Sequence, residues 1–452
     1  MLLNLCKYLS AASKLDVDDV HYNITSDKFN LRCFGKENLP RKGVLIRLFS
    51  FIKYFVKSGS TIFSDKKANA NNTLFFVNNK NEFLAIEPVY AKITDAHIAG
   101  YGLYYDKCPY FLAYIISILF LPFVFYKFII ADEDKKDIYA YALDSYLLTY
   151  GFYVMCRIWI EQIKPESIVI SNDLIFTNRV ILLVAKELGI VTFYIQHAAV
   201  NSNFPPLTVD YALLDGRDAV DKYYECGPTS AIIYIIGISK FDSLYNKINN
   251  LKVLARLGIC TNNLDSIERI EELCITMRST FPSLIIYLRT HPADRRTDNL
   301  KKLASRLGIN YSDSKNELSY DFLQSVDVVI GCNSNILLEA AMMDVHPLYF
   351  DFSRTNLDWY GFVKSGLVEY YSDSKPLCGR LLELQKSKPS IRSKARFYSG
   401  TVGTRYDGRS SDLASSIIKE ITAGHTINMN LWDKIPNDKL KAYELRVNDA
   451  AQ

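Results

Sequence analysis

From Thr73 onward, short apolar runs alternate with amphipathic segments along most of the chain. Apolar runs of four or five residues between turn residues are typical of buried parallel strands, and apolar residues three and four apart are typical of helices. In the first half they predict strands over 74–77, 97–102, 167–170, 191–195 and 211–214 and helices over 79–92, 136–163, 177–188 and 217–224. This alternation predicts βαβ units and a doubly wound parallel sheet.

The second half repeats the scheme, with strands expected over 256–260, 284–288, 309–311, 328–330 and 347–350 and helices between them. Because 452 residues exceed one ordinary core, we expect two domains. The predicted fold class is α/β, with two Rossmann-like, doubly wound parallel-sheet domains facing a cleft. A polar cluster within 238–251 marks their boundary, and a helix over 410–422 is expected to cross back onto the first domain. The predicted ranges are an N-terminal segment 1–72, a first domain 73–245, a second domain 246–423 and a polar tail 424–452.

Two segments bear on membrane contact. The segment Tyr110–Tyr126 has seventeen residues without a charge, which is at the lower limit for a membrane-spanning helix of about 20 residues. It is a buried or groove-forming helix, an in-plane membrane contact or a span. Upstream, the basic residues of 41–57 interleave with apolar ones. That pattern indicates either a membrane-surface helix or a solvated helix face.

The bulk composition narrows the class of protein. A hydrophobic content of 49% with 23% charged residues indicates a folded globular chain, and a net charge of +4 gives no support to nucleic-acid binding. Nine scattered cysteines without a C-x-x-C pair argue against zinc sites and disulfides and favour a reducing cytosol. Residues 1–15 lack the long apolar core of a signal peptide. We therefore expect a cytoplasmic protein.

Polar residues follow three predicted strands of the first domain, where ligands of open parallel sheets bind. Asp173, His197 and Asp215 stand at these strand ends and are the candidate catalytic residues. A histidine there can act as a general base, although it can equally be a hydrogen-bonded structural residue. Asp215 is the rival base, and its alternative role is to cap the helix that follows.

In the second domain, Arg289-Thr-His-Pro292 closes one strand, and Gly331-Cys-Asn-Ser-Asn335 closes another and opens a helix. The free backbone N–H groups of a helix start, polar side chains and a His-Pro turn together favour a phosphate. These features predict a nucleotide-sugar pocket. Arg289 either contacts phosphate or is structural, and Glu339 either accepts from ribose or is solvated. The candidate donor-binding residues are Arg289, His291, Pro292, Asn333, Ser334, Asn335, Glu339, Thr261 and Ser410.

Several common motifs are missing from the sequence. It contains no G-x-x-x-x-G-K-[ST], no G-x-G-x-x-G behind a strand and no G-x-S-x-G. No Asp-x-Asp stands at a predicted strand end, which disfavours a metal-dependent transferase, and no His/Cys/carboxylate group has zinc spacing. We therefore expect no metal ion and no bound cofactor.

The order of these motifs resembles the two-domain GT-B glycosyltransferases of bacterial surface polysaccharide assembly. His291-Pro292 and the later helix start are similar to the HP and SS motifs of GT-B sialyltransferases and other CMP-sugar enzymes, which implies that His291 and Ser334 contact the donor. Asp215-Gly216 is similar to the acidic-Gly motif that holds the base in those enzymes. The chain departs from the pattern because one acid precedes the glycine and Asn333-Ser-Asn335 replaces a Ser-Ser pair.

Gln196-His197 and His291-Pro292 are also similar to motifs of teichoic-acid CDP-polyol phosphotransferases, although Ala198 replaces the usual glycine. The resemblances imply a metal-independent glycosyltransferase that moves a sugar from a nucleotide donor, CMP-linked if the sialyltransferase likeness holds. Its acceptor would be lipid- or polysaccharide-linked, in capsule or O-antigen synthesis. The alternatives are transfer of glycerol or ribitol phosphate from a CDP-polyol, an epimerase and a non-catalytic relative. A lipid-linked acceptor further implies a peripheral protein on the inner face of the cytoplasmic membrane.

Overall fold

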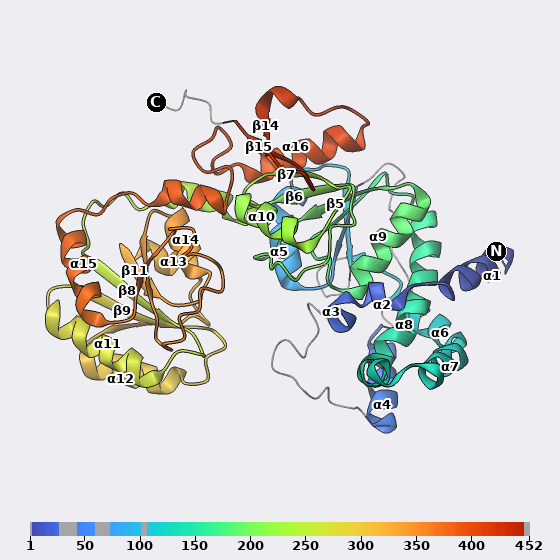
Figure 1. The fold of residues 1–452 in the computed structure, drawn as a ribbon, viewed down its shortest axis with the longest axis horizontal. Helices are drawn as coiled ribbons and strands as arrows, with labels where there is room; N and C mark the ends of the chain where they lie inside the picture. Colours follow the sequence, from blue (N-terminus) through green and yellow to red (C-terminus); the bar gives the residue numbers. More distant parts are fainter. Residues whose placement is uncertain (1, 27–42, 59–72, 101–105, 447–452) are drawn as a thin grey trace. The chain divides into compact units, whose positions relative to one another are not determined.

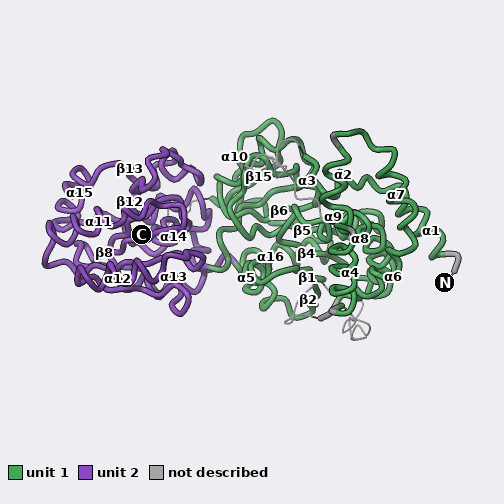
Figure 2. Tube along the Cα trace, turned by 90° about the horizontal axis from the view of Figure 1, so that it is seen from below, with its two compact units in different colours: residues 1–240, 411–446 green, residues 241–410, 447–452 purple. Residues whose placement is uncertain are grey.

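The computed structural model describes residues 2–26, 43–58, 73–100 and 106–446, which form two compact units (Figures 1 and 2). Unit 1 comprises Met1–Lys240 and Ser411–Arg446, and unit 2 comprises Phe241–Ser410. Each unit is a mainly parallel sheet with helices packed against it. The predicted fold class, α/β with two doubly wound parallel sheets, is therefore confirmed.

Unit 1 contains a nine-stranded sheet of order β14-β15-β7-β6-β5-β4-β1-β2-β3 within the described residues. All neighbouring pairs are parallel except β14 and β15. The central strands β1 and β4 are buried throughout, which explains their apolar sequences. The strands are β1 Thr73–Val77, β2 Ala96–Gly100, β3 Asp106–Lys107, β4 Ser167–Ile170, β5 Val191–Ile195, β6 Tyr211–Leu214, β7 Ile232–Ile235, β14 Trp432–Lys434 and β15 Lys441–Leu445.

The helices of unit 1 begin and end at recognisable signals. Asn79 caps α5 by accepting from the Glu82 backbone N–H, and Asp132 caps α8 in the same way through Lys135. Gly189 ends α9 at a φ of 69°, a conformation that glycine adopts without strain. The helices are α1 Leu2–Ala12, α2 Val17–Val20, α3 Tyr22–Thr25, α4 Val44–Ser58, α5 Lys80–Tyr90, α6 Tyr110–Leu119, α7 Leu121–Ile130, α8 Glu133–Ile163, α9 Phe176–Leu188, α10 Arg217–Cys226 and α16 Ser410–Thr422.

Unit 2 contains a six-stranded parallel sheet of order β10-β9-β8-β11-β12-β13. Its strands are β8 Arg256–Thr261, β9 Ile285–Thr290, β10 Asn310–Ser312, β11 Val328–Gly331, β12 His346–Phe350 and β13 Glu369–Tyr371. Its helices are α11 Ile267–Thr280, α12 Thr297–Leu307, α13 Ser319–Gln324, α14 Ile336–Met342 and α15 Ser374–Lys386, with 3₁₀ turns η3 Ser239–Lys247 and η4 Arg392–Phe397. The third 3₁₀ turn, η5 Met429–Leu431, belongs to unit 1.

In each sheet the order of the parallel strands reverses between two neighbouring strands. In unit 1 the chain runs outward from β1 through β2 and β3 and then returns to β4 on the other side of β1. In unit 2 it runs outward from β8 through β9 and β10 and returns to β11 beside β8. The helices that follow such a strand pair lie on opposite faces of the sheet, so a crevice forms at the carboxyl ends of the pair.

The C-terminal part differs from the predicted ranges. The predicted second domain extends to residue 423, but unit 2 ends at Ser410, and α16 belongs to unit 1, where the Thr422 hydroxyl donates to Ser167 Oγ over 2.9 Å. The predicted polar tail instead forms the antiparallel pair β14 and β15 at the edge of the unit 1 sheet. Leu440 and Ala442 are buried there on either side of the exposed Lys441, and this alternation indicated a strand that we missed.

The uncharged segment Tyr110–Tyr126 forms two helices, α6 and α7, with a bend of 60° between them. No single helix in the described ranges has the length and hydropathy of a membrane span, whereas this bent pair does by length and composition. The basic helix predicted upstream is α4, and it packs on α6 through stacked rings of Phe55 and Phe111 at 4.6 Å. Arg41 and Lys42 lie outside the described residues. Arg47 pairs with Asp144, so this charge stabilises the contact with α8.

The contact between α6 and α8 depends on a glycine. A methyl group added at Gly151 would lie 2.1 Å from the Ala113 carbonyl oxygen and 2.2 Å from Ser117 Oγ, both on α6. Gly151→Ala should therefore lower the free energy of unfolding by about 1–3 kcal/mol, because the two helices must separate. Urea unfolding followed by circular dichroism measures the change.

The matched control is Gly379→Ala in α15, where an added methyl group meets nothing within 4 Å. This change should raise stability by about 0.5–1 kcal/mol, because glycine costs that much in a helix. Equal effects of the two substitutions would contradict the close approach of α6 to α8.

Candidate functional site

A pocket of about 480 Å³ lies in unit 2 at the carboxyl ends of β8, β9 and β11, where the chain order reverses. This is the place at which ligands of doubly wound sheets bind. Eight of the nine predicted donor-binding residues line it, and Ser410 does not. The lining comprises Cys260–Leu264, Arg289–Pro292, Ser314, Glu317–Ser319, Asn333–Ile336, Glu339 and Tyr360.

His291 is an exposed residue in the turn that follows β9. Its Nδ1 accepts a hydrogen bond from the Ala293 backbone N–H over 3.1 Å, which assigns the ring proton of the neutral imidazole to Nε2. The same turn is fixed by Arg296, which bonds Asp294 and donates to the carbonyls of Asp265 and Asn262 over 2.6 and 2.7 Å. The histidine therefore presents an N–H donor from a braced loop.

The polar triplet after β11 divides into a structural residue, Asn333, and two residues with side chains that reach solvent, of which Ser334 is partly exposed and Asn335 is exposed. Asn333 accepts from the Trp359 N–H over 2.9 Å and donates to the Leu357 carbonyl over 3.2 Å, so its amide holds the loop after β12. Ser334 Oγ accepts from the Ile336 N–H over 3.4 Å, and Asn335 lies at the cap position of α14. Ser334 and Asn335 are thus better placed than Asn333 to contact a ligand.

The loop after β8 holds polar atoms without partners. The hydroxyl of Thr261 is buried and has no hydrogen-bond partner among the described residues, and the same holds for Asp265 Oδ1. Burial raises the pKa of Asp265 to about 7, against the opposing hydrogen bond from the Asn262 backbone. A buried hydroxyl without a partner costs free energy, so Thr261 marks a position that a bound ligand can satisfy.

Arg289 is held by the protein although it lines the pocket. Its guanidinium donates to Ser312 Oγ over 2.6 Å and to the Glu317 carbonyl over 2.8 Å, and it forms an ion pair with the Glu317 carboxylate at 3.2 Å. These bonds tie β9 to β10 and to the segment before α13. The geometry therefore favours the structural alternative for Arg289. Ser410 is bonded elsewhere, through its hydroxyl to Thr401 over 2.7 Å and through its N–H to Asp242.

In unit 1, His197 follows β5 and Asp215 follows β6. The side chain of Gln196 links the two loops that carry them. Gln196 Oε1 accepts from the Asp215 backbone N–H over 3.0 Å, and its Nε2 donates to the Ala198 carbonyl over 3.0 Å. Burial lowers the pKa of His197 and raises the pKa of Asp215 well above its usual range. His197 Nδ1 is buried without a partner among the described residues. Asp215 does not cap α10, because Gly216 occupies that position and no side chain caps it.

A buried network that the sequence analysis missed lies at the reversal between β1 and β4. Glu82 is fully buried, and its carboxylate accepts from the Asn78 N–H over 2.8 Å, from Asn79 Nδ2 over 2.7 Å and from Asn172 Nδ2 over 3.2 Å. Burial raises its pKa, which these bonds oppose. Asn178 completes the network by donating to the Asn172 carbonyl over 2.6 Å. The available signal was the pair Asn79 and Glu82, a capping-box spacing behind a strand.

Asp173 follows this network and is 3% exposed, with Oδ2 unpartnered in the described part of the chain. Burial raises its pKa to about 6, and the charge of Arg179 opposes the shift. Arg179 donates to the Asp173 carbonyl over 3.3 Å and pairs with Asp19 at 2.9 Å. The three predicted catalytic residues thus stand at neighbouring strand ends, and all three have pKa values displaced by burial.

No protein-family model and no curated protein sequence matches this chain. Solved structures match it at low identity. They include a Listeria monocytogenes protein assigned as a UDP-N-acetylglucosamine 2-epimerase, with a TM-score of 0.52, 14% identity and coverage of 79% of this chain and 98% of that chain. The Neisseria meningitidis UDP-GlcNAc 2-epimerase bound to UDP-GlcNAc gives 0.52 at 12% identity, covering 77% and 99%. A further UDP-N-acetylglucosamine 2-epimerase gives 0.50 at 12%, covering 82% and 99%. These likenesses show the GT-B fold alone.

The raised pKa of Asp173 makes a prediction about stability. A carboxyl whose pKa is about 6 in the folded state and 3.8 in the unfolded state favours folding fully only below pH 3.8, and this contribution is lost as the pH rises through 6. Asp173→Asn should therefore stabilise the protein more at pH 8 than at pH 5, by about 1–2 kcal/mol, because the amide carries no charge to bury. Urea unfolding of both proteins at the two pH values measures the difference. An equal change at pH 5 and pH 8 would show that Asp173 carries no strained charge.

Proposed function

We propose that this protein is a metal-independent glycosyltransferase that moves a sugar from a nucleotide-activated donor to a lipid- or polysaccharide-linked acceptor of a bacterial surface polymer. The observation that carries the proposal is the unit 2 pocket at the β8–β11 reversal, with an N–H donor at His291 and a buried unpartnered hydroxyl at Thr261. Its volume of about 480 Å³ is in the ordinary range for small-molecule sites.

In this proposal the nucleotide occupies unit 2. The Nε2–H of His291 and the hydroxyl of the partly exposed Ser334 face the phosphates, so hydrogen bonds replace the cation that other transferases use to stabilise the leaving group. Glu339 lines the same pocket one turn into the helix, where a carboxylate can accept from ribose hydroxyls. CMP, CDP, UDP and GDP donors share these phosphate and ribose groups. Binding measurements with each of them will therefore identify the nucleobase of the donor.

Proton transfer is assigned to unit 1. Burial lowers the pKa of His197 and keeps its ring neutral at pH 7, which is the form that accepts a proton. Its ring bonds the Ser171 backbone, and Nδ1 is the nitrogen without a partner. The raised pKa of Asp215 leaves a larger share of that carboxyl protonated. We therefore favour His197 over Asp215 as the base that takes the acceptor hydroxyl proton.

A second candidate function is epimerisation of a nucleotide sugar. It is favoured by one observation, namely that the solved structures with TM-scores of at least 0.50 named above are UDP-N-acetylglucosamine 2-epimerases. An epimerase needs the same nucleotide pocket but no acceptor. Transfer of a polyol phosphate from a CDP-polyol is the third reaction that the same motifs support.

We also propose that unit 1 binds the cytoplasmic face of the membrane peripherally. Large apolar side chains are exposed along α4 and along α6 and α7, among them Phe49 at 70%, Leu119 at 62% and Ile130 at 61%. The helix α4 packs on α6, and α7 follows α6 after the bend (Figure 1). An apolar surface of this kind on a soluble domain marks a binding site, and the exposed Lys53 on α4 suits anionic lipids. A lipid-linked acceptor stays in the bilayer, which gives the contact its purpose.

The donor pocket makes the first prediction for this function. In a thermal-shift screen, one of CMP-, CDP-, UDP- or GDP-linked donors should raise the midpoint, since a ligand at 100 times its Kd adds about 2.7 kcal/mol of stability. His291→Ala should abolish most of that shift, whereas His425→Ala, an exposed histidine in unit 1, should leave it unchanged. His197→Ala should retain the shift and lose turnover.

The product distinguishes the candidate reactions. Transfer predicts a labelled glycoconjugate that forms only when membrane acceptors are added. A modified nucleotide sugar formed without acceptor indicates epimerisation, and a phosphodiester in the phosphorus NMR spectrum of the product indicates polyol-phosphate transfer. Donor binding without any turnover would refute the proposal that this protein is an enzyme.

The apolar surface predicts binding to vesicles that contain anionic lipid. Wild-type protein should sediment with them at low salt and be released partly by high salt. Phe49→Asp should weaken the association about tenfold or more, because one apolar side chain contributes about 1.5–3 kcal/mol when it leaves water. Leu264→Asp, a residue of unit 2 that is 78% exposed, is the matched control and should bind as wild type. Wild-type protein that stays in solution at low salt would refute the membrane proposal.

A further inference from the structure

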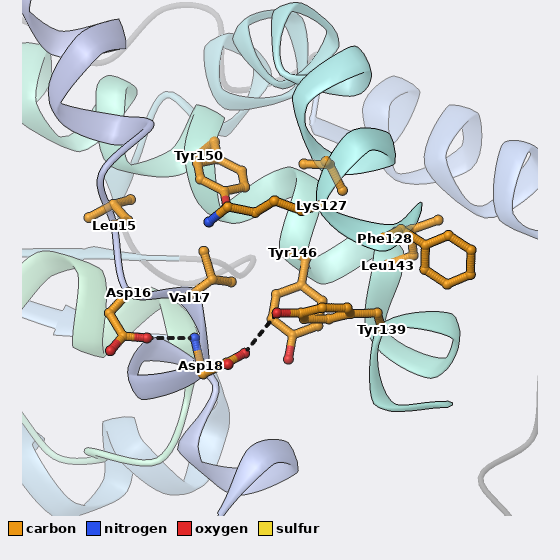
Figure 3. Close-up of a pocket in the computed structure, with 11 residues that line it drawn as sticks. Leu15, Asp16, Val17, Asp18, Lys127, Phe128, Tyr139, Leu143, Tyr146 and Tyr150 are labelled. Carbon is orange, nitrogen blue, oxygen red and sulfur yellow. Dashed lines mark hydrogen bonds between the residues drawn. The ribbon is translucent and has the colours of Figure 1, made fainter. Parts of the chain in front are cut away.

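A second cavity, of about 220 Å³, lies within unit 1 beside α7 (Figure 3). Its walls come from the α1–α2 connection, from α7 and from α8, and none of its residues belongs to the candidate site described above. The lining comprises Leu15, Asp16, Val17, Asp18, Val124, Lys127, Phe128, Tyr139, Leu143, Tyr146 and Tyr150. It therefore combines apolar walls with tyrosine hydroxyls, carboxylates and one ammonium group.

The wall from α8 is a tyrosine face. Tyr139, Leu143, Tyr146 and Tyr150 are spaced by four, three and four residues, so they lie on one side of the helix. Tyr146 is 3% exposed, and its hydroxyl has no hydrogen-bond partner in the part of the chain that the structure describes. Because buried polar groups are nearly always bonded, this hydroxyl requires a partner that the described residues do not supply.

The cavity also contains the ammonium group of Lys127. Its Nζ lies 3.4 Å from the Tyr150 hydroxyl and 5.0 Å from the centre of the Phe123 ring, and it forms no ion pair with any described residue. The acids of the cavity are occupied, since Asp18 pairs with Lys135 at 3.1 Å and Asp16 caps α2. The cavity thus places one ammonium group, together with two carboxylates that are already bonded within the protein, beside apolar walls. The ammonium group can pair with an anionic group carried on a hydrocarbon.

The position of the cavity relates it to two other features of unit 1. On one side, α7 exposes Phe125, Ile129 and Ile130 as part of the apolar surface. On the other side, the Tyr146 ring packs at 4.6 Å on His21, which stacks at 5.3 Å on Phe176, the first residue of α9. The loop that carries Asp173 immediately precedes that residue. The cavity therefore lies between the apolar surface and the strand ends where proton transfer is proposed.

We propose that this cavity binds the phosphate of a membrane lipid whose hydrocarbon lies along α7, and that this lipid is the acceptor carrier of the transfer reaction. Only the assignment of this lipid as the acceptor carrier rests on the proposed function; the binding of a lipid phosphate does not. Lys127 pairs with a phosphate oxygen, the Tyr146 hydroxyl bonds a second oxygen of the head group, and Leu15, Val124 and Phe128 contact the first carbons of the chain.

The test uses the full-length protein and a ten-carbon prenyl monophosphate below its micelle concentration, with the matching prenyl alcohol and inorganic phosphate as separate ligands. Calorimetry should show that the monophosphate binds at least about tenfold more tightly than either, because the charged contact and the apolar contact act together. Lys127→Gln should weaken the monophosphate about tenfold or more and leave the alcohol unchanged. Tyr146→Phe, which keeps the ring that packs on His21, should weaken it severalfold.

The matched control is Lys186→Gln on α9, which removes one exposed positive charge from the same unit without touching the cavity. It should bind the monophosphate as wild type does. Equal affinity of the Lys127→Gln and wild-type proteins would overturn the inference. Binding of inorganic phosphate as tight as that of the monophosphate would also overturn it, by showing a plain anion site.

Further measurements separate the lipid source and the function. Vesicles of anionic phospholipid that displace the monophosphate as effectively as a membrane extract containing the lipid-linked acceptor would overturn the acceptor assignment. Monophosphate binding that depends on Lys127 in a protein that transfers no sugar from any donor would refute the proposed function and leave the cavity assignment standing. Sugar transfer by the wild type without monophosphate binding would do the reverse.

Discussion

Both units depend on one constraint of doubly wound sheets. The chain adds strands outward from one strand and must then return to that strand's other side, so the strand order reverses between two adjacent parallel strands. Where it does so, helices leave on opposite faces, and the strand ends are covered by neither. Backbone groups at these ends cannot be satisfied by the sheet, so polar side chains collect there. Between β8 and β11 this gives the pocket of about 480 Å³, and between β1 and β4 it gives the network around Glu82.

The two reversals resolve the same constraint differently. In unit 1 the buried carboxylate of Glu82 accepts from the side chains of Asn79 and Asn172 and from the Asn78 backbone N–H, so the protein itself satisfies these polar groups. Its neighbour Asp173 keeps one oxygen without a partner among the described residues. In unit 2 the crevice is open, and Thr261 is the buried group left unsatisfied beside it. A filled crevice positions strand ends rigidly, whereas an open one accepts a ligand. This difference is the reason why we propose unit 2 as the donor-binding unit.

The sequence predicted most of the sheet because its central strands are continuous apolar runs. The observed β4, β5 and β6 match the predicted ranges 167–170, 191–195 and 211–214, and the predicted pocket residues mostly converge. What escaped prediction depends on distant partners. Strands β14 and β15 are short and half polar, and they are stabilised by pairing with β7 and with each other. Arginine is a residue type that often binds phosphate, so the sequence favoured Arg289 as a ligand contact. Its partners Ser312 and Glu317 are brought to it only by the pairing of β10 with β9, which the sequence did not reveal.

The apolar surface of unit 1 raises a question of energetics that the fold itself answers. A soluble domain normally buries side chains such as Phe49 and Ile130, because each gains about 1.5–3 kcal/mol on leaving water. Here Arg47 of α4 faces the core and pairs with Asp144 of α8. The helix α6 is also held against α8, where Gly151 permits a close approach. The apolar side chains are thus exposed by the way these helices are held against the core. Contact with lipid, which we propose for this surface, would remove these side chains from water without changing that packing.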